Sequence, residues 1–227
     1  MRQKLIVILP VMFAAILTWM LYRIFMDVPD ELNQGAVFRI IYFHLPAALT
    51  SFLGYYVAMG FGIMYLVKKD LRYDAIAAPI NEVSTAFALV TLITGSIWGR
   101  IIWGIWWTWD PRLTSYFICL LMYGSYFMLR RAIDEPNQRA TLSAVLSIFA
   151  ALDIVIVWKS IEWWPTQHPQ PVLSIRNGGG MAPGMEAPIY WNILAMTLLA
   201  TALVLIRMRQ EKMKREIDAM RRYAHAV

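Results

Sequence analysis

The chain has 227 residues, of which 59% are hydrophobic and only 16% charged, and its mean hydropathy is +0.50. A soluble domain needs a more highly charged surface, so this composition excludes an ordinary soluble fold and predicts a polytopic membrane protein. The formal net charge is +6, but the charged residues lie in short clusters between apolar runs and form no basic face of a soluble domain. We therefore expect no nucleic-acid partner.

Six apolar runs are long enough to cross a bilayer as helices, which takes about twenty residues each. The first run is too long for the core of a signal peptide and has no clear cleavage site after it, so we expect a retained helix. The predicted fold is therefore all-α, with six transmembrane helices in a single integral membrane domain, 1–227. The predicted spans are 5–26, 40–66, 82–102, 113–129, 141–160 and 189–206.

The distribution of basic residues predicts the orientation of the chain. Both termini and the connections 68–80 and 130–140 carry 15 of the 21 basic residues. Because basic residues favour the cytoplasmic side, both termini should be cytoplasmic, including a basic tail at 208–227. The outer side then receives three segments, which are 27–39, a tryptophan-rich segment at 98–115 and a long loop at 161–188.

Half of the ten tryptophans lie in one short stretch that includes WGIWWTWD at 103–110. An aromatic belt spreads tryptophan over many helix ends, so the cluster favours a platform for a planar ligand, with a belt or a packing role as the alternative. If the stretch is helical, Gly99 and Gly104 leave gaps for such a ligand, and the indoles at 103, 106 and 107 share one face. The candidate platform residues are Trp98, Trp103, Trp106, Trp107 and Trp109.

Two of the three histidines, His44 and His168, fall on the predicted outer side, and the third, His225, lies in the tail. A single histidine near a helix end is most often structural, but two beside an aromatic platform favour a metal-containing ligand. Two imidazoles are too few for a typical zinc site, whereas they suffice as axial ligands of haem, in which the porphyrin supplies four nitrogens. Arg100 and Arg112 are candidate cations for the haem propionates, and Arg112 could equally bind lipid phosphate.

Three acidic residues have structural interpretations beside functional ones. Asp110 before Pro111 is typical of a helix start, here that of the fourth span. Asp153 lies within the fifth span, where a carboxylate is either functional or part of a structural pair. Glu82 lies near a cytoplasmic helix end and is expected to be solvated. The 161–188 loop, rich in Pro and Gly, is long enough to be either functional or disordered.

The tryptophan-rich stretch WGIWWTWDPRLTS, with TGSIWG upstream, resembles the WWD motif of haem-handling proteins of cytochrome c maturation. The resemblance is closest to the CcmC type, the haem exporter protein C family. IYFHLPAA and WWPTQH are similar to the two histidine-bearing outer segments of that family. The resemblance extends from the first span through the sixth and leaves out the basic tail after Arg207.

This resemblance implies a multi-pass protein of the bacterial inner membrane that holds haem b as transient cargo at its periplasmic face and is not an enzyme. His44 and His168 match the axial ligands of the family. The implied partners are a periplasmic haem chaperone of the CcmE type, an ABC-type complex of the CcmA and CcmB types, a small membrane subunit of the CcmD type, and membrane lipid. The motif positions are matched by Trp103, Trp106, Trp107, Trp109 and Asp110.

Because the 161–188 loop is long, we expect His168 to be the ligand released when haem passes to the chaperone, and His44, at a helix start, to be held more rigidly. Two other functions stay open. A subunit of a haem-attaching cytochrome c synthetase should carry a further histidine pair inside the membrane, which the six predicted spans lack. A secondary transporter using Asp153 should show internal repeats, and none is visible in the sequence.

Overall fold

The computed structural model describes residues 2–169 and 181–224, and within them it contains six α-helices and no β-strand. A π-helix, η1 (Arg23–Asp27), extends the first α-helix, and a 3₁₀-helix, η2 (Ala36–Ile40), leads into the second. The predicted all-α class is thus confirmed. The α-helices are α1 (Arg2–Tyr22), α2 (Ile41–Lys68), α3 (Leu71–Trp103), α4 (Pro111–Ala132), α5 (Pro136–Trp163) and α6 (Ala187–Ala224).

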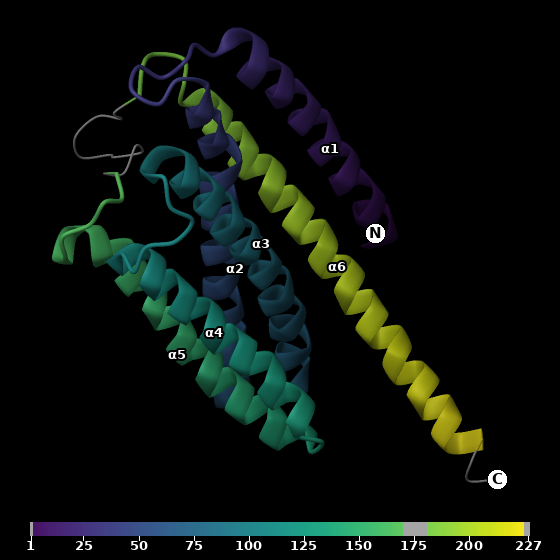
Figure 1. The fold of residues 1–227 in the computed structure, drawn as a ribbon. Coiled ribbons are helices and arrows are strands. Elements are labelled where there is room, and N and C mark those ends of the chain that lie inside the picture. Colours follow the sequence, from purple (N-terminus) through teal and green to yellow (C-terminus); the bar gives the residue numbers. More distant parts are fainter. Residues whose placement is uncertain (1, 170–180, 225–227) are drawn as a thin grey trace.

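Helices α2, α3, α4 and α5 form an antiparallel bundle, α6 packs along α2 and α3, and α1 packs on α6 (Figure 1). Successive helices alternate in direction, so the connections after α1, α3 and α5, as far as they are described, meet at one end of the molecule. The C-terminal end of α6 and the short connections α2–α3 and α4–α5 lie at the opposite end. The fold therefore brings the predicted outer segments to the same end of the bundle.

Among the described residues, five helices are long and apolar enough to span a membrane, and α4 is not one of them. The tyrosines and serines of α4 lower its mean hydropathy. Tyr116, Tyr123 and Tyr126 are nevertheless buried against neighbouring helices, and Tyr123 stacks on Tyr55 of α2 with ring centroids 3.6 Å apart. A helix whose polar groups face other helices can cross a membrane at modest hydropathy, so the packing supports the prediction of a sixth crossing.

Two helices extend well beyond their predicted spans. α3 begins early because Asp70 caps its N-terminus, accepting a hydrogen bond from the Arg72 amide at 2.9 Å. The predicted connection 68–80 is therefore wrong in extent and reduces to Lys69 and Asp70, and the basic tail continues α6 as far as Ala224. An apolar run marks the part of a helix that lies in hydrocarbon, whereas the helix itself ends where its caps and its backbone hydrogen bonds end.

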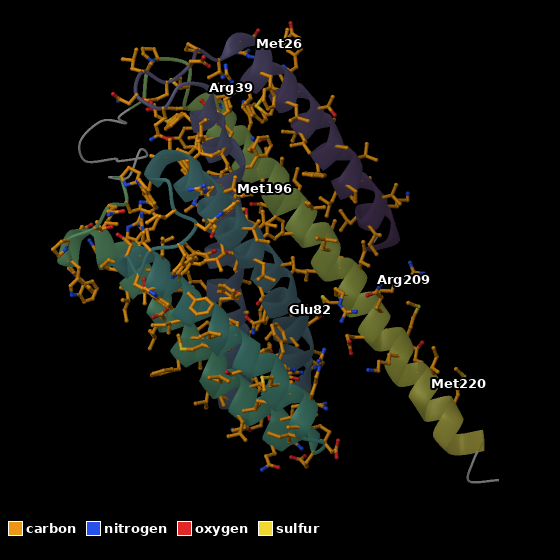
Figure 2. All side chains as sticks on the ribbon, in the orientation of Figure 1. Met26, Arg39, Glu82, Met196, Arg209 and Met220 are labelled. Carbon is orange, nitrogen blue, oxygen red and sulfur yellow. The ribbon has the colours of Figure 1, made fainter. Side chains whose placement is uncertain are left out.

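Glu82 on α3 contacts α6. Arg207 donates to its carboxylate from Nε at 3.0 Å and from Nη2 at 2.9 Å. The Glu82 side chain is 48% exposed, so it lies at the surface as expected, but within an ion pair. Beyond this contact α6 continues past Arg209 to Met220, away from the four-helix bundle (Figure 2).

Candidate functional site

The two outer histidines line one cavity at the predicted outer end of the bundle. His44 reaches it from α2 and His168 from the segment after α5. The cavity has a volume of about 280 Å³, close to the lower end, ~300 Å³, of the usual range for small-molecule sites. Leu49, Phe52 and Leu92 give it an apolar wall. The structure thus brings together two histidines that are far apart in the sequence.

The hydrogen bonds around His44 determine which of its ring nitrogens is free. His44 Nδ1 lies 3.0 Å from the Thr94 hydroxyl oxygen. That hydroxyl donates its own proton to a backbone carbonyl of the preceding turn, Val90 at 2.7 Å or Thr91 at 3.1 Å, so it accepts from His44. The network therefore assigns the proton to Nδ1 and leaves the lone pair of Nε2 available to a metal.

Gly95 makes room for the His44 ring. A Cβ at this position would lie 3.0 Å from His44 Cε1, so any larger residue would displace the imidazole. The sequence had instead singled out Gly99 and Gly104. A Cβ at Gly99 would lie 3.1 Å from the Trp103 indole, and Gly104, with φ of 77°, ends α3 in the left-handed conformation. Gly99 lines the cavity, as the expected close approach of a ligand requires, whereas Gly104 does not.

Asp110 connects the start of α4 to the segment that carries His168. It caps α4 as predicted, accepting from the Arg112 amide at 3.0 Å, with Pro111 in the first turn. Its second oxygen accepts from the Gln167 amide at 2.9 Å and from the Thr166 hydroxyl. Asp110 is only 8% exposed, so these bonds are shielded from water. No local pattern indicates this second role, because its partners lie more than fifty residues away.

The His168 ring is held as a neutral imidazole. Its Nδ1 lies 3.1 Å from the Pro169 carbonyl and 3.4 Å from Arg112 Nη1. One nitrogen cannot both donate to a carbonyl and accept from a guanidinium, and the shorter contact assigns the proton to Nδ1. Burial, together with the Arg112 charge, lowers the pKa of His168 to about 4. The ring is therefore neutral near pH 7, with Nε2 unprotonated, as metal ligation requires.

Of the two candidate cations, only Arg112 lines the cavity. It donates to two carbonyls in the last two turns of α5, from Nε to Val157 and from Nη2 to Trp158, each at 3.3 Å. Its guanidinium also lies over the Trp158 ring, 6.0 Å from the centroid. Arg100 is exposed and donates instead to the Gly104 carbonyl at the end of its own helix.

The tryptophans divide into two groups. Trp98 and Trp103 line the cavity, and Trp98 donates from Nε1 to Gln34 Oε1 at 2.7 Å. α3 ends at Trp103, so the helical face expected across 98–109 does not form. The other three do not line the cavity: Trp107 packs edge-on against Phe117, and the remaining two, Trp106 and Trp109, are 61% and 73% exposed.

The sequence reading missed several lining residues that come from other elements. Gln34, Tyr116 and Trp158 each contribute to the wall from a different segment. Trp158 could have been predicted from the sequence, because it is a tryptophan that lies one to two helical turns before the WWPTQH segment. Nothing in the sequence indicates a role for Gln34. Asp153 lies outside the cavity lining and is 8% exposed, and its Oδ2 has no hydrogen-bond partner among the described residues.

Part of the predicted 161–188 loop lies outside the described residues, from 170 to 180, and so does His225. Of the described part, the first residues complete α5 as far as Trp163. The segment from Thr166 to His168 is fixed by the contacts with Asp110. The position of His168 therefore depends on hydrogen bonds that the composition of the loop did not reveal.

Comparison with known proteins gives consistent matches. A family model described as Heme exporter protein C matches residues 1–223, which includes most of the tail that the sequence resemblance left out. Heme exporter protein C of Bradyrhizobium diazoefficiens is 36% identical over 85% of this chain and 73% of its own length. The Escherichia coli K12 protein of the same name is 36% identical over 80% and 73%, and that of Paracoccus denitrificans 33% over 85% and 80%.

Proposed function

Because the chain belongs to the Heme exporter protein C family, its role is the handling of haem in cytochrome c maturation, and we propose that it holds haem b between His44 and His168. In this proposal the cavity faces the periplasm from the inner membrane, and the haem is delivered from there to a haem chaperone of the CcmE type. The protein acts by binding and transfer, without catalysing a reaction itself.

One observation carries the proposal, namely that two histidines line the same apolar cavity and each has a hydrogen-bond partner at Nδ1, which leaves Nε2 free for a metal. Neutral imidazoles are the usual axial ligands of haem iron, and aromatic and aliphatic walls suit a porphyrin. The residues present therefore fit the group. Bound haem would supply the iron, and the chain would supply ligands whose tautomers are already set by Thr94 and by the Pro169 carbonyl.

The exposed tryptophans support a docking role for the loop between α3 and α4. Trp106, Trp109 and the neighbouring Ile105 are all largely exposed beside the cavity-lining Trp103. Indole side chains are common at the centre of protein interfaces, where their area and their N–H group both contribute. We propose that the chaperone docks on this loop. The protein works within an ABC-type haem exporter complex, for which subunits of the CcmA, CcmB and CcmD types, together with membrane lipid, are the proposed partners.

The proposal is tested with purified protein loaded with haem and mixed with the purified chaperone. Transfer of the haem absorption from this protein to the chaperone is the expected result. Haem that stays bound under all conditions would contradict delivery, and a protein that never binds haem would contradict the site.

Arg112 and Arg100 form a matched pair of variants that tests whether a cation at the cavity contributes to haem binding. Arg112→Ala should weaken haem binding by about 10–100-fold, because a hydrogen bond to a charged group contributes ~1.5–3 kcal/mol. Arg100→Ala should change binding less than about twofold, since its guanidinium bonds to Gly104 outside the cavity. Haem titration followed by absorbance in detergent measures both. Equal losses of haem affinity in the two variants would show that Arg112 has no specific role in haem binding.

The two groups of tryptophans should differ in what they affect. Trp98→Ala or Trp103→Ala should lower haem content, because each removes part of the cavity wall. Trp106→Ala or Trp109→Ala should leave haem content near that of the wild type and slow transfer to the chaperone, since both indoles are exposed. Haem content of the purified variants and the rate of transfer are the two measurements. Loss of haem from Trp106→Ala as large as that from Trp98→Ala would contradict this division.

A further inference from the structure

A second, much smaller cavity lies at the other end of the bundle, among α2, α3, α4 and α5. It leaves about 10 Å³ for the centre of a water molecule, which is about the minimum that one buried water needs, ~10–15 Å³. Its wall is unusually polar for the interior of a membrane protein. The polar side chains that line it are Tyr65, Asp74, Asn81, Tyr126, Ser143 and Ser147.

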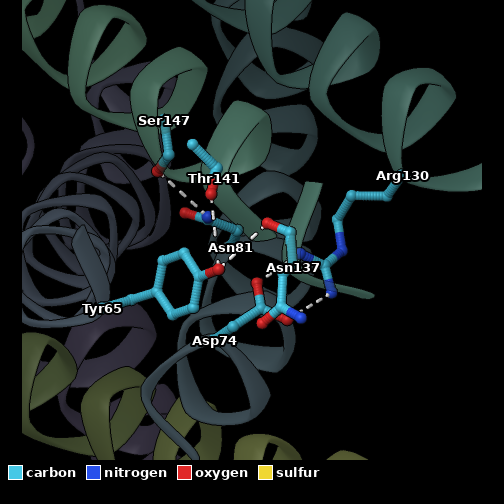
Figure 3. A network of polar contacts seen from close by, with 7 residues as sticks. All are labelled: Tyr65, Asp74, Asn81, Arg130, Asn137, Thr141 and Ser147. Atoms are coloured by element: carbon cyan, nitrogen blue, oxygen red, sulfur yellow. Dashed lines mark hydrogen bonds and ion pairs between the residues drawn. The ribbon is translucent and has the colours of Figure 1, made fainter. Parts of the chain in front are cut away.

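Most of the polar groups around this cavity already have partners (Figure 3). Asn81 donates from Nδ2 to Ser147 Oγ at 3.1 Å, which joins α3 to α5. Arg130 donates to both oxygens of Asp74, at 2.5 and 3.0 Å, which joins α4 to α3. The Tyr65 hydroxyl donates to a carbonyl at the start of α5 at 2.9 Å. The four helices of the bundle are therefore linked by polar contacts at this end.

Two polar atoms of residues that line the cavity have no hydrogen-bond partner among the described residues. They are Asn81 Oδ1 and Ser143 Oγ, and their residues are 0% and 1% exposed. Buried polar atoms in folded proteins almost always have a partner, either protein or ordered water, because leaving one unpaired is costly. A water molecule in this cavity would give both atoms a partner.

We propose that this cavity binds one structural water molecule that bridges Asn81 on α3 and Ser143 on α5. The water donates to Asn81 Oδ1 and forms a second hydrogen bond with Ser143 Oγ. Tyr126 lines the same cavity from α4, and a hydrogen bond with its hydroxyl would be a third contact, the number typical of a buried water. The site completes the polar links at this end of the bundle and is independent of the haem-binding proposal.

The effect of Ser143→Ala on stability has opposite signs for a hydrated and a dry cavity. If the water is present, the substitution removes one of its partners and weakens its hold on Asn81, so the protein is destabilised. If the cavity is dry, the substitution removes an unpaired buried hydroxyl, so stability is unchanged or increased. Ser84→Ala is the matched control, since Ser84 on α3 is also buried, at 4% exposed, but its hydroxyl donates to the Ile80 carbonyl of its own helix.

The experiment measures the thermal unfolding midpoint of the full chain in detergent for the wild type and both variants. We expect Ser143→Ala to lower the midpoint by roughly 2–4 °C or more and Ser84→Ala to lower it by much less. An unchanged or raised midpoint for Ser143→Ala would overturn the proposal, as would equal falls in both variants. An experimental structure that resolves buried waters elsewhere in the bundle should also show one between Asn81 and Ser143, and its absence there would overturn the proposal independently.

Discussion

Replacing His44 with alanine is expected to remove most of the haem from the purified protein. The substitution deletes an imidazole that Thr94 orients and Gly95 accommodates. Losing a hydrogen bond that orients a metal ligand typically costs 10–100-fold in metal affinity, so loss of the ligand itself should cost at least ~100-fold. Haem content per protein, measured from the absorption spectrum after purification, gives the result.

Thr94 provides graded controls for this experiment. Thr94→Ser keeps the hydroxyl that accepts from His44 Nδ1 and should bind haem nearly as well as the wild type. Thr94→Val removes the acceptor at similar size and should weaken binding by ~10–100-fold. A His44→Ala protein with wild-type haem content and spectrum would show that His44 is not a ligand.

Asp110→Asn should reproduce the spectrum of His168→Ala, although residue 110 does not line the cavity. Asparagine still caps a helix well, so α4 should be preserved. If its amide oxygen caps Arg112, its amide nitrogen takes the place of the second carboxylate oxygen and cannot accept from the Gln167 amide or the Thr166 hydroxyl. Hydrogen bonds to a charged group contribute ~1.5–3 kcal/mol each, so the population with His168 in place should fall by roughly tenfold or more.

The absorption spectra of the haem-loaded variants test this expectation directly. Asp70→Asn is the control, because Asp70 caps α3 in the same way at the opposite end of the bundle and has no role at the cavity. If Asp110→Asn leaves the His168 ligand signature intact, the carboxylate acts only as a helix cap.

These contacts refine the expected order of ligand release. His168 was expected to leave first because its loop is long, yet Asp110 holds the residues just before it. If His168 is a ligand, we expect its release to be accompanied by loss of the contacts of Asp110 with Thr166 and Gln167. Asp110 directly follows Trp109, which is exposed on the proposed docking loop, so a chaperone that binds there is well placed to weaken those contacts.

The sequence predicted the parts of the fold that depend on hydrophobicity. The number of long helices follows from the number of apolar runs. Because successive membrane-spanning helices run in opposite directions, the sequence also predicts that His44 and His168 lie at the same end of the bundle. Helix ends were predicted less well. Asp70 starts α3 outside the apolar run, because a side-chain cap needs no hydrophobicity.

The details of the site depend on contacts between distant segments, which no local pattern encodes. Trp98 and Trp106 look equivalent in the sequence, but α3 ends between them, so only Trp98 lines the cavity. Gly95 and Gly99 are spaced one turn apart, yet only Gly95 lies against His44. Both distinctions arise from where the helix ends and from which neighbour it packs against.

The most direct test of the central claim, that haem is held by His44 and His168 together, is magnetic resonance of the ferric haem complex. The protein would carry ¹⁵N-labelled histidine and the substitution His225→Ala, so that only two labelled imidazoles remain. We predict a low-spin signal with hyperfine couplings to two labelled nitrogens, and loss of one coupling in His44→Ala and in His168→Ala wherever haem is retained. A wild-type complex with one labelled nitrogen or none on the iron would contradict the account.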